Sequence, residues 1–120
     1  SCLIATTCDG TRRCVPRNAF GFVDDKFADS SCAEPAVALT RGDCDLPLPD
    51  TLMSTSADCA DGPRFYHRGE ELVEVYERDV DAPDALSCVL AQPPKNGWRY
   101  YRVGEPIALE TFPALVERVE

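Results

Sequence analysis

The sequence predicts a small antiparallel all-β domain that is stapled by disulfides and built of repeated hairpin units. Short apolar or β-branched runs alternate with turn residues along all 120 residues, and no stretch has the apolar spacing of a long helix. Seven cysteines occur without a Cys-x-x-Cys pair. A stretch near the middle of the chain, 64–72, returns in diverged form at 99–107, which is typical of a repeated structural unit.

In the first half of the chain, the apolar runs between turns are expected to be strands. The first two pair as a hairpin, because the dipeptide Asp9-Gly10 between them suits the positive φ of a tight turn. Pro16 ends that hairpin, since proline has no N–H for the ladder. A stretch rich in Pro, Asp and Ser, 45–58, is expected to be a loop. The expected strands cover 3–7, 12–15, 19–23 and 36–40.

The second half is organised around the duplicated stretch. Aromatic and charged residues that end in glycine are typical of a strand that runs into a turn. We therefore expect 64–69 and 99–104 to be extended and equivalent, with Tyr66 and Tyr101 in equivalent environments. Further strands are expected at 71–77 and 88–91, and a turn of helix near 111–113 is expected to lead into a strand towards residue 120.

Length, composition and charge bound what the chain can be. A length of 120 residues and a hydrophobic content of 44% suit one globular domain, 1–120, with sub-units of about 1–58 and 59–120. The 12 Lys and Arg against 21 Asp and Glu give a net charge of −9, which repels phosphate backbones and anionic lipid. No apolar run approaches the ~20 residues of a membrane span. We therefore expect no nucleic-acid partner and no membrane insertion.

The cysteines indicate a disulfide framework, because metal-ligand spacing is missing and the chain has a single histidine. Such a framework places the protein in an oxidising compartment: secreted, periplasmic or at the cell surface. The chain opens on Ser1 without a signal peptide, so we expect either a mature chain or a fragment of a longer exported protein.

Sequence alone does not assign the pairing of these cysteines, but spacing favours some pairs. Two pairs, Cys32–Cys44 and Cys59–Cys88, would each bracket one strand-turn unit. A third, Cys2–Cys14, would tie the ends of the first hairpin, and Cys8–Cys14 is the alternative to it. One cysteine of the seven must be left over, and we expect Cys8, at the hairpin tip, to be unpaired or bonded to another chain. The favoured pairs are Cys2–Cys14, Cys32–Cys44 and Cys59–Cys88.

No catalytic, metal or cofactor site is expected from the residues. The only histidine, His67, has Arg102 as its repeat equivalent, and a position that accepts either residue is expected to be exposed rather than catalytic. The acidic clusters at 24–29 and 79–84 lack the spacing and the glycine of an EF-hand loop, so they are expected to be solvated turns.

Aromatic and arginine side chains concentrate in the second half of the chain. These residue types dominate interface hot spots, although sheets favour them as well. The repeat therefore supplies a candidate binding face for a protein partner or for self-association. Its residues are Arg64, Tyr66, Arg68, Arg99, Tyr101 and Arg102.

Three short strings carry a resemblance to a known group of proteins: Arg13 to Pro16, Phe27 to Pro35, and Tyr101 to Ile107. They resemble Cys-containing β-repeat segments of secreted proteins of the myxobacterial type. The resemblance brings no activity with it. It implies export, a β-repeat architecture and a place within a longer surface protein.

These features together predict an exported, non-catalytic structural or recognition module, acting as a subunit of an extracellular or cell-surface assembly. One alternative is a small secreted inhibitor or binding protein that acts alone. Another is a hydrolase fragment, since paired carboxylates can cleave glycosidic bonds and Glu70 and Glu105 recur in the repeat, close to His67. Both glutamates follow a glycine in a repeated turn, so we expect them to be structural.

Overall fold

Ten strands account for nearly all the regular structure in the computed structural model, which describes residues 2–23, 25–40, 47–54, 59, 61–81 and 87–115. Among these residues the only helix is a single 3-10 turn, η2 (Leu109–Thr111), close to the turn of helix expected at 111–113. The predicted all-β fold is therefore confirmed. The strand expected towards residue 120 lies outside the described part of the chain.

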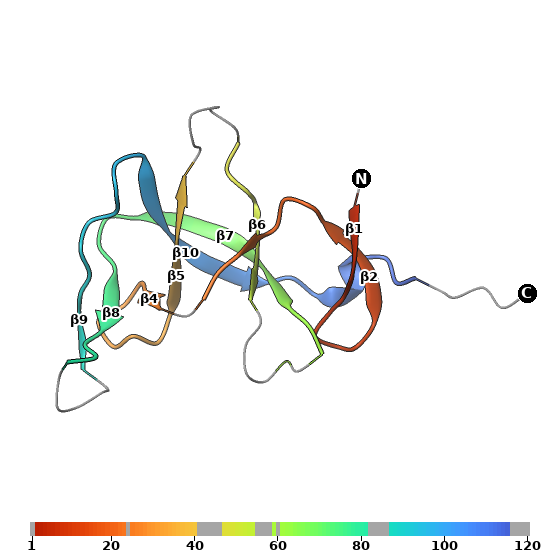
Figure 1. Cartoon of the computed structure of the whole chain (residues 1–120), viewed down its shortest axis with the longest axis horizontal. Coiled ribbons are helices and arrows are strands. Elements are labelled where there is room, and N and C mark those ends of the chain that lie inside the picture. Colours follow the sequence, from red (N-terminus) through yellow and green to blue (C-terminus); the bar gives the residue numbers. More distant parts are fainter. Residues whose placement is uncertain are drawn as a thin grey trace, which may run out of the picture.

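The strands form two sheets. A two-stranded sheet pairs β1 (Cys2–Thr6) with β2 (Arg12–Pro16) as the expected antiparallel hairpin, seen at the right of Figure 1. An eight-stranded sheet has the order β3-β6-β7-β10-β5-β4-β8-β9. All its neighbours are antiparallel except β3 and β6, which are parallel. Its strands are β3 (Phe20–Gly21), β4 (Lys26–Phe27), β5 (Pro35–Thr40), β6 (Thr51–Ser54), β7 (Arg64–Leu72), β8 (Tyr76–Arg78), β9 (Cys88–Leu90) and β10 (Trp98–Pro106).

The two halves of the sequence share the larger sheet. β10 lies between β7 and β5, and β4 lies between β5 and β8, so strands from 1–58 and 59–120 alternate in pairs. The expected sub-units are therefore not separate sheets. This arrangement follows from the pairing of β10 with β5, which places Tyr100 opposite Ala38 and Tyr101 opposite Val37.

Three expectations about strand positions were wrong. The solvated turn expected at 24–29 contains β4, whose Phe27 is 6% exposed because it lies between β5 and β8. The expected loop 45–58 contains β6, because Leu52 and Ser54 point inward from that strand and are both buried, with Leu52 fully so. The single strand expected at 71–77 is divided: β7 runs to Leu72, and β8 begins only at Tyr76. Between them Val75 is buried in a core cluster, which holds the bend in place.

The two copies of the repeat are both extended, as expected, and lie side by side as β7 and β10. Each copy brings a glycine against the other strand. A Cβ on Gly69 would lie 2.8 Å from the backbone oxygen of Arg102, and a Cβ on Gly104 would lie 2.7 Å from that of His67. Because His67 and Arg102 are equivalent positions, the two strands are related by an approximate two-fold axis. Close approach of the backbones requires glycine at both positions.

Three clusters of buried side chains form the core. Tyr100 and Tyr101 are consecutive on β10, so they point to opposite faces of the sheet and join different clusters. The first cluster contains Val37, Leu39, Leu52, Tyr101 and Val103, with Tyr66 packed partly buried against it; the two equivalent tyrosines thus share a cluster but differ in burial. The second contains Ala36, Val75, Ala91 and Tyr100, and the third Val15, Phe65 and Phe112.

The third cluster joins the small sheet to the large one. Phe65 of β7 is 1% exposed and meets the ring of Phe112 edge to face at 5.0 Å between centroids. Val15 of β2 completes the contact from the hairpin. Arg13 adds a polar link, because its guanidinium donates a hydrogen bond of 2.9 Å to the backbone oxygen of Phe112 and pairs with Asp9 at 2.8 Å. The hairpin is therefore held by both apolar and polar contacts.

Three disulfides are present among the described residues. Cys2–Cys14 ties the ends of the hairpin as expected. The other favoured pairs, Cys32–Cys44 and Cys59–Cys88, were wrong. The expectation that Cys8 is unpaired or bonded to another chain was also wrong. Cys8 bonds to Cys59, and Cys32 bonds to Cys88. The seventh cysteine, Cys44, lies outside the described residues.

The strand order explains the corrected pairing. Cys32 lies in the turn between β4 and β5, and Cys88 begins β9, one strand beyond the β8 that pairs with β4. The hairpin turn that carries Cys8 lies against the chain that enters β7, where the Cys8 amide donates a hydrogen bond of 2.9 Å to the backbone oxygen of Pro63. Both bonds therefore join segments that are distant in sequence and adjacent in space.

Candidate functional site

A cleft of about 410 Å³ opens near one end of the larger sheet, between β8, β4, β5 and the segment that leads into β10. It is lined by the only tryptophan of the chain, a tyrosine, two prolines and three charged side chains. Aromatic and proline rings with a few polar groups are the usual lining of a recognition site. The lining residues are Lys26, Ala38, Glu77, Gln92, Pro93, Pro94, Lys95, Trp98 and Tyr100.

The register of β10 and β5 creates the hollow. Trp98 and Tyr100 are two residues apart on β10 and therefore share a face. Tyr100 lies opposite Ala38, whose small side chain leaves the space above the strand unfilled. Tyr100 is nearly buried, whereas Trp98 is 37% exposed. The tyrosine thus forms the floor of the cleft, and the indole ring remains open to solvent at its rim.

Hydrogen bonds fix the wall formed by residues 91–97. The Tyr100 hydroxyl donates to the backbone oxygen of Gln92 at 3.0 Å, and the Thr40 hydroxyl donates to that of Gly97 at 2.9 Å. Gly97 has φ of +89°, a conformation that favours glycine, and the Trp98 amide closes the same turn on the Lys95 oxygen at 2.9 Å. The wall is therefore pre-organised around the aromatic pair.

The polar groups of the cleft are divided between its floor and its rim. The ammonium group of Lys26 pairs with Glu77 at 2.9 Å, and this hydrogen bond raises the pKa of the lysine. Lys95, in contrast, is exposed and makes no ion pair with any described residue. The cleft therefore presents apolar rings, an ion pair without net charge at its floor, and one cation at its rim.

A second hollow, of about 490 Å³, lies at the seam between the hairpin and the β3–β6 end of the large sheet. Its floor includes Val15 and Phe65, which are core residues, and its walls include the exposed Leu3 and Val23. Arg17 is its single charged lining residue. This seam has far fewer groups that would select one ligand over another, so we take the Trp98 cleft as the candidate site.

The six residues of the expected binding face do not form one surface. Tyr101 is buried in the core, and the guanidinium of Arg68 stacks over its ring at 5.4 Å. Arg102 points to the opposite face from Tyr101, where it pairs with Glu34 and Glu70. Alternation along a strand sends neighbouring residues to opposite faces, which is why a contiguous set divides. The other members, Arg64, Tyr66 and Arg99, lie on β7 and β10 as expected.

The glutamates of the repeat are placed in solvent. Arg102 donates a hydrogen bond of 2.6 Å to Glu70, and this bond lowers the pKa of that carboxyl group. A general acid requires the opposite shift, towards a raised pKa. Glu105 and His67 are likewise exposed on β10 and β7, as expected for His67.

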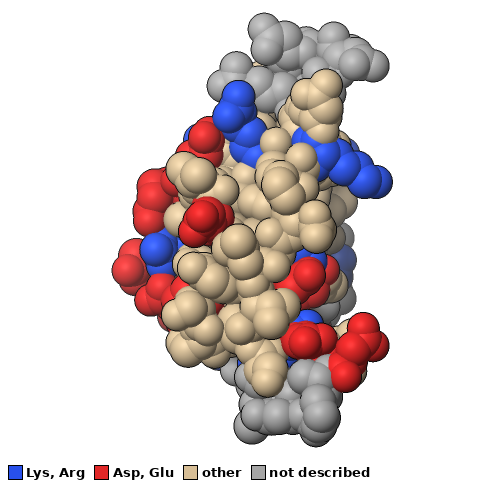
Figure 2. All heavy atoms as spheres, turned by 90° about the vertical axis from the view of Figure 1, so that its left-hand side faces the viewer, with Lys and Arg blue, Asp and Glu red and all other residues tan. Residues whose placement is uncertain are grey.

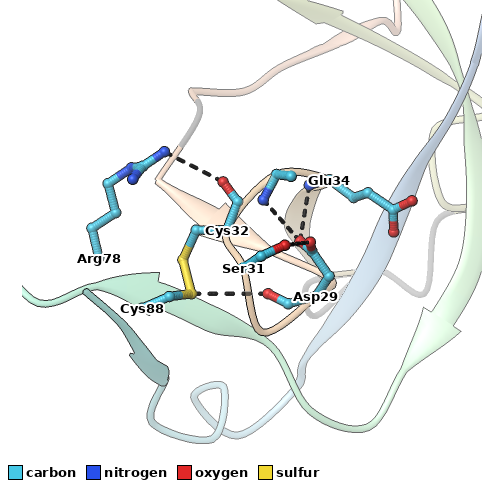
Figure 3. The surroundings of a disulfide bond; sticks show 7 residues. Asp29, Ser31, Cys32, Glu34, Arg78 and Cys88 are labelled. Carbon is cyan, nitrogen blue, oxygen red and sulfur yellow. Dashed lines mark hydrogen bonds between the residues drawn. A yellow bond between two sulfur atoms is a disulfide. The ribbon is translucent and has the colours of Figure 1, made fainter. Parts of the chain in front are cut away.

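The acidic residue Asp29 holds the turn that presents Cys32 (Figure 3). Its carboxylate accepts hydrogen bonds from the backbone amides of Ala33 and Glu34, both at 2.9 Å, and from the Ser31 hydroxyl. Cys32 has φ of +55°, which few residues other than glycine adopt. The first acidic cluster therefore serves a turn beside the Cys32–Cys88 bond. Asp24 and Asp84 lie outside the described residues.

We expect Asp29→Asn to reduce the loss of stability in acid. The main cause is the hydrogen bond that the Asp29 carboxylate accepts from the backbone amide of Glu34, which lowers the pKa of Asp29 from 3.8 to about 2. A carboxyl group whose pKa is lowered by folding stabilises the protein above its unfolded pKa, and that contribution is lost as the pH falls towards the folded one. Chemical denaturation between about pH 4 and pH 2 should show a shallower decline for the variant. Asp25→Asn, in a side chain that is 65% exposed, is the matched control and should follow the wild type.

No three His, Cys, Asp or Glu side chains of the described chain gather in a way that could hold a metal ion. Its single helical turn is neither long nor apolar enough to cross a membrane. The three disulfides are consistent with an oxidising extracellular environment. Comparison of the whole chain with protein-family models, with curated proteins and with solved structures gave no match.

Proposed function

We propose that this chain is a non-catalytic recognition module of an exported protein, which binds a segment of a protein partner in the Trp98 cleft. The observation that carries the proposal is the exposed indole of Trp98 beside an open, pre-formed hollow. Exposed aromatic anchors that are set in a rigid frame provide binding energy at low cost in conformational entropy. The partner would belong to an extracellular or cell-surface assembly.

The chemistry of the lining supports a peptide-like ligand. Trp98, Tyr100 and the rings of Pro93 and Pro94 form an aromatic and apolar groove, the arrangement by which extended segments are held in several recognition domains. The Lys26–Glu77 pair and the exposed ammonium group of Lys95 supply partners for backbone and polar side-chain groups. Export is supported by the disulfides, which form and persist in oxidising compartments.

Selection of random peptides against the immobilised chain tests the proposal. Because Trp98 is the only tryptophan, its emission reports directly on the cleft. We expect the selected peptides to shift that emission, and we expect Trp98→Ala to weaken their binding about 30-fold, the effect of a hot-spot residue. Calorimetry measures the affinity of both forms.

Ile4→Ala provides the control. Ile4 is 52% exposed and lies on β1, in the two-stranded sheet that takes no part in the cleft. The control should leave binding of the selected peptides within about twofold of the wild type, as expected for a surface substitution away from the site. Selected peptides that bind the Trp98→Ala variant as tightly as the wild type, or a selection that returns no binder, would contradict the proposal.

A further inference from the structure

The alternation of hydrogen bonds between β8 and β9 determines which backbone groups of β9 point away from β8, towards the edge of the sheet. The Asp79 amide donates to the Ser87 oxygen at 2.8 Å, and the Ala91 amide donates to the Val75 oxygen at 2.9 Å. In an antiparallel pair, hydrogen-bonded residues alternate with residues whose N–H and C=O groups point away. Val89, midway between these two pairs, therefore bonds to β8. The peptide groups of Cys88 and Leu90 point to the outer edge.

β9 ends the larger sheet, and no described strand pairs with that outer edge. Exposed edges are normally protected by a very short strand, proline, lysine, a bulge or a covering segment. β9 is short, with three residues, but none of them is charged or proline, and Val89 and Leu90 are 40% and 56% exposed. The strand thus presents an apolar edge whose donors and acceptors are not used by any described strand.

The edge is also held rigidly. Cys88 is bonded to Cys32 in the turn fixed by Asp29, as Figure 3 shows. The guanidinium of Arg78, on the neighbouring strand β8, donates a hydrogen bond of 3.3 Å to the Cys32 oxygen. A fixed edge loses little conformational entropy when another strand adds to it, and this favours binding.

Charge indicates what kind of strand would add. Figure 2 looks onto this end and shows an uncharged band with acidic side chains along its margins and basic side chains among them, chiefly near the top of the view. Glu74, Asp79 and Asp81 lie around β8 and make no ion pairs with described residues. Arg78 is the one basic residue of that strand, so the acidic side chains are in excess there. The whole chain carries a charge of −9, so a second copy would be repelled. A cationic partner meets complementary charge.

We propose that the outer edge of β9 accepts an extended cationic segment of a partner protein, which adds to the sheet as a further strand. This inference rests on the proposed function and names the binding mode and the partner's chemistry. Val89 pairs with Glu77, so both lie on the face that carries the Trp98 cleft. A segment paired with β9 therefore runs beside the cleft. Its uncharged side chains lie on that face, towards the rim, where Lys95 would repel a cation.

A short synthetic peptide that alternates lysine with valine is the probe, and amide hydrogen exchange is the direct readout. Edge amides exchange quickly when they are free and become protected when a strand pairs with them. We expect the amides of Cys88 and Leu90 to gain about tenfold protection or more. The Val89 amide, already bonded to β8, is the internal control and should change little. A matched peptide with glutamate in place of lysine should bind at least about tenfold more weakly.

Leu90→Pro separates backbone pairing from side-chain contact. Proline at this position removes an N–H that faces outward, so it leaves the ladder with β8 intact, and the preceding Val89 is already extended. We expect this variant to bind the lysine-valine peptide about tenfold more weakly, whereas Leu90→Thr, which keeps the amide, stays within about threefold of the wild type.

Methylated peptides test the same pairing without altering the protein. Only alternate amides of an added strand face β9, so N-methylation of either the lysines or the valines should abolish binding, and methylation of the other set should leave it. Equal binding of both methylated peptides, or unchanged exchange at Cys88 and Leu90, would overturn the inference.

The variants keep this inference distinct from the proposed function. Selected peptides that require Trp98 but bind Leu90→Pro normally would overturn strand addition and leave the cleft proposal standing. A lysine-valine peptide that requires the Leu90 amide but not Trp98 would support strand addition and contradict the cleft. Failure of the lysine-valine peptide to bind the wild-type chain at all would overturn strand addition alone.

Discussion

Phe65→Ala is expected to lower the free energy of unfolding by about 3–5 kcal/mol, the cost of emptying a well-packed aromatic position. Phe65 is 1% exposed and meets Phe112 edge to face in the cluster that joins the two sheets. Domains of this size have a total stability of about 5–15 kcal/mol, so the variant should unfold at far lower denaturant concentration. Urea denaturation followed by circular dichroism measures the change.

Phe20→Ala is the control for this substitution because it removes the same atoms from an exposed position. It should cost less than about 1 kcal/mol. Equal destabilisation by the two variants would mean that the cluster around Phe65 does not link the hairpin to the larger sheet.

Replacement of Cys8 and Cys59 together by alanine is expected to cost about 4 kcal/mol by the chain-entropy model of cross-linking. The bond joins residues 51 apart in sequence and ties the hairpin turn to the chain that enters β7. A two-stranded hairpin is marginal on its own, so its attachment depends on this bond and on the contacts of the third core cluster. Denaturation without reductant measures the loss.

The Cys2–Cys14 pair gives an internal comparison, since it closes only 12 residues within the hairpin. Its replacement by alanine should cost about 3 kcal/mol in the same model. A larger loss for this pair than for Cys8 and Cys59 would show that the long-range bond does not constrain the unfolded chain as proposed.

Features that depend on residues close together in the sequence could be predicted, whereas features that depend on contacts between distant segments could not. The hairpin around Asp9-Gly10 depends on a turn that short-range preferences specify, and the two repeat strands depend on their own residues. The pairing of Cys8 with Cys59 depends on the order of strands, which leaves no local signal. Strand β6 was missed because its short apolar stretch lies among proline, aspartate and serine residues.

The candidate site also depends on the pairing of segments that are distant in the sequence. The cleft exists because Tyr100 pairs with Ala38, a register that no composition reveals. The alternation of Trp98 and Tyr100 after Pro93-Pro94 is the signal in the sequence that would have directed attention to it. The open edge of β9 likewise follows from strand order, since the sequence of the strand is equally suited to the middle of a sheet.

The three disulfide loops overlap along the chain, and this has a consequence for cleavage by proteases. The loop closed by Cys2–Cys14 contains Cys8, and the loop from Cys8 to Cys59 contains Cys32, whose partner is Cys88. Every peptide bond from Cys2 to Cys88 therefore lies inside at least one loop. A single cut anywhere in that range leaves both fragments covalently joined, so a nicked molecule keeps all its strands in one covalently connected body.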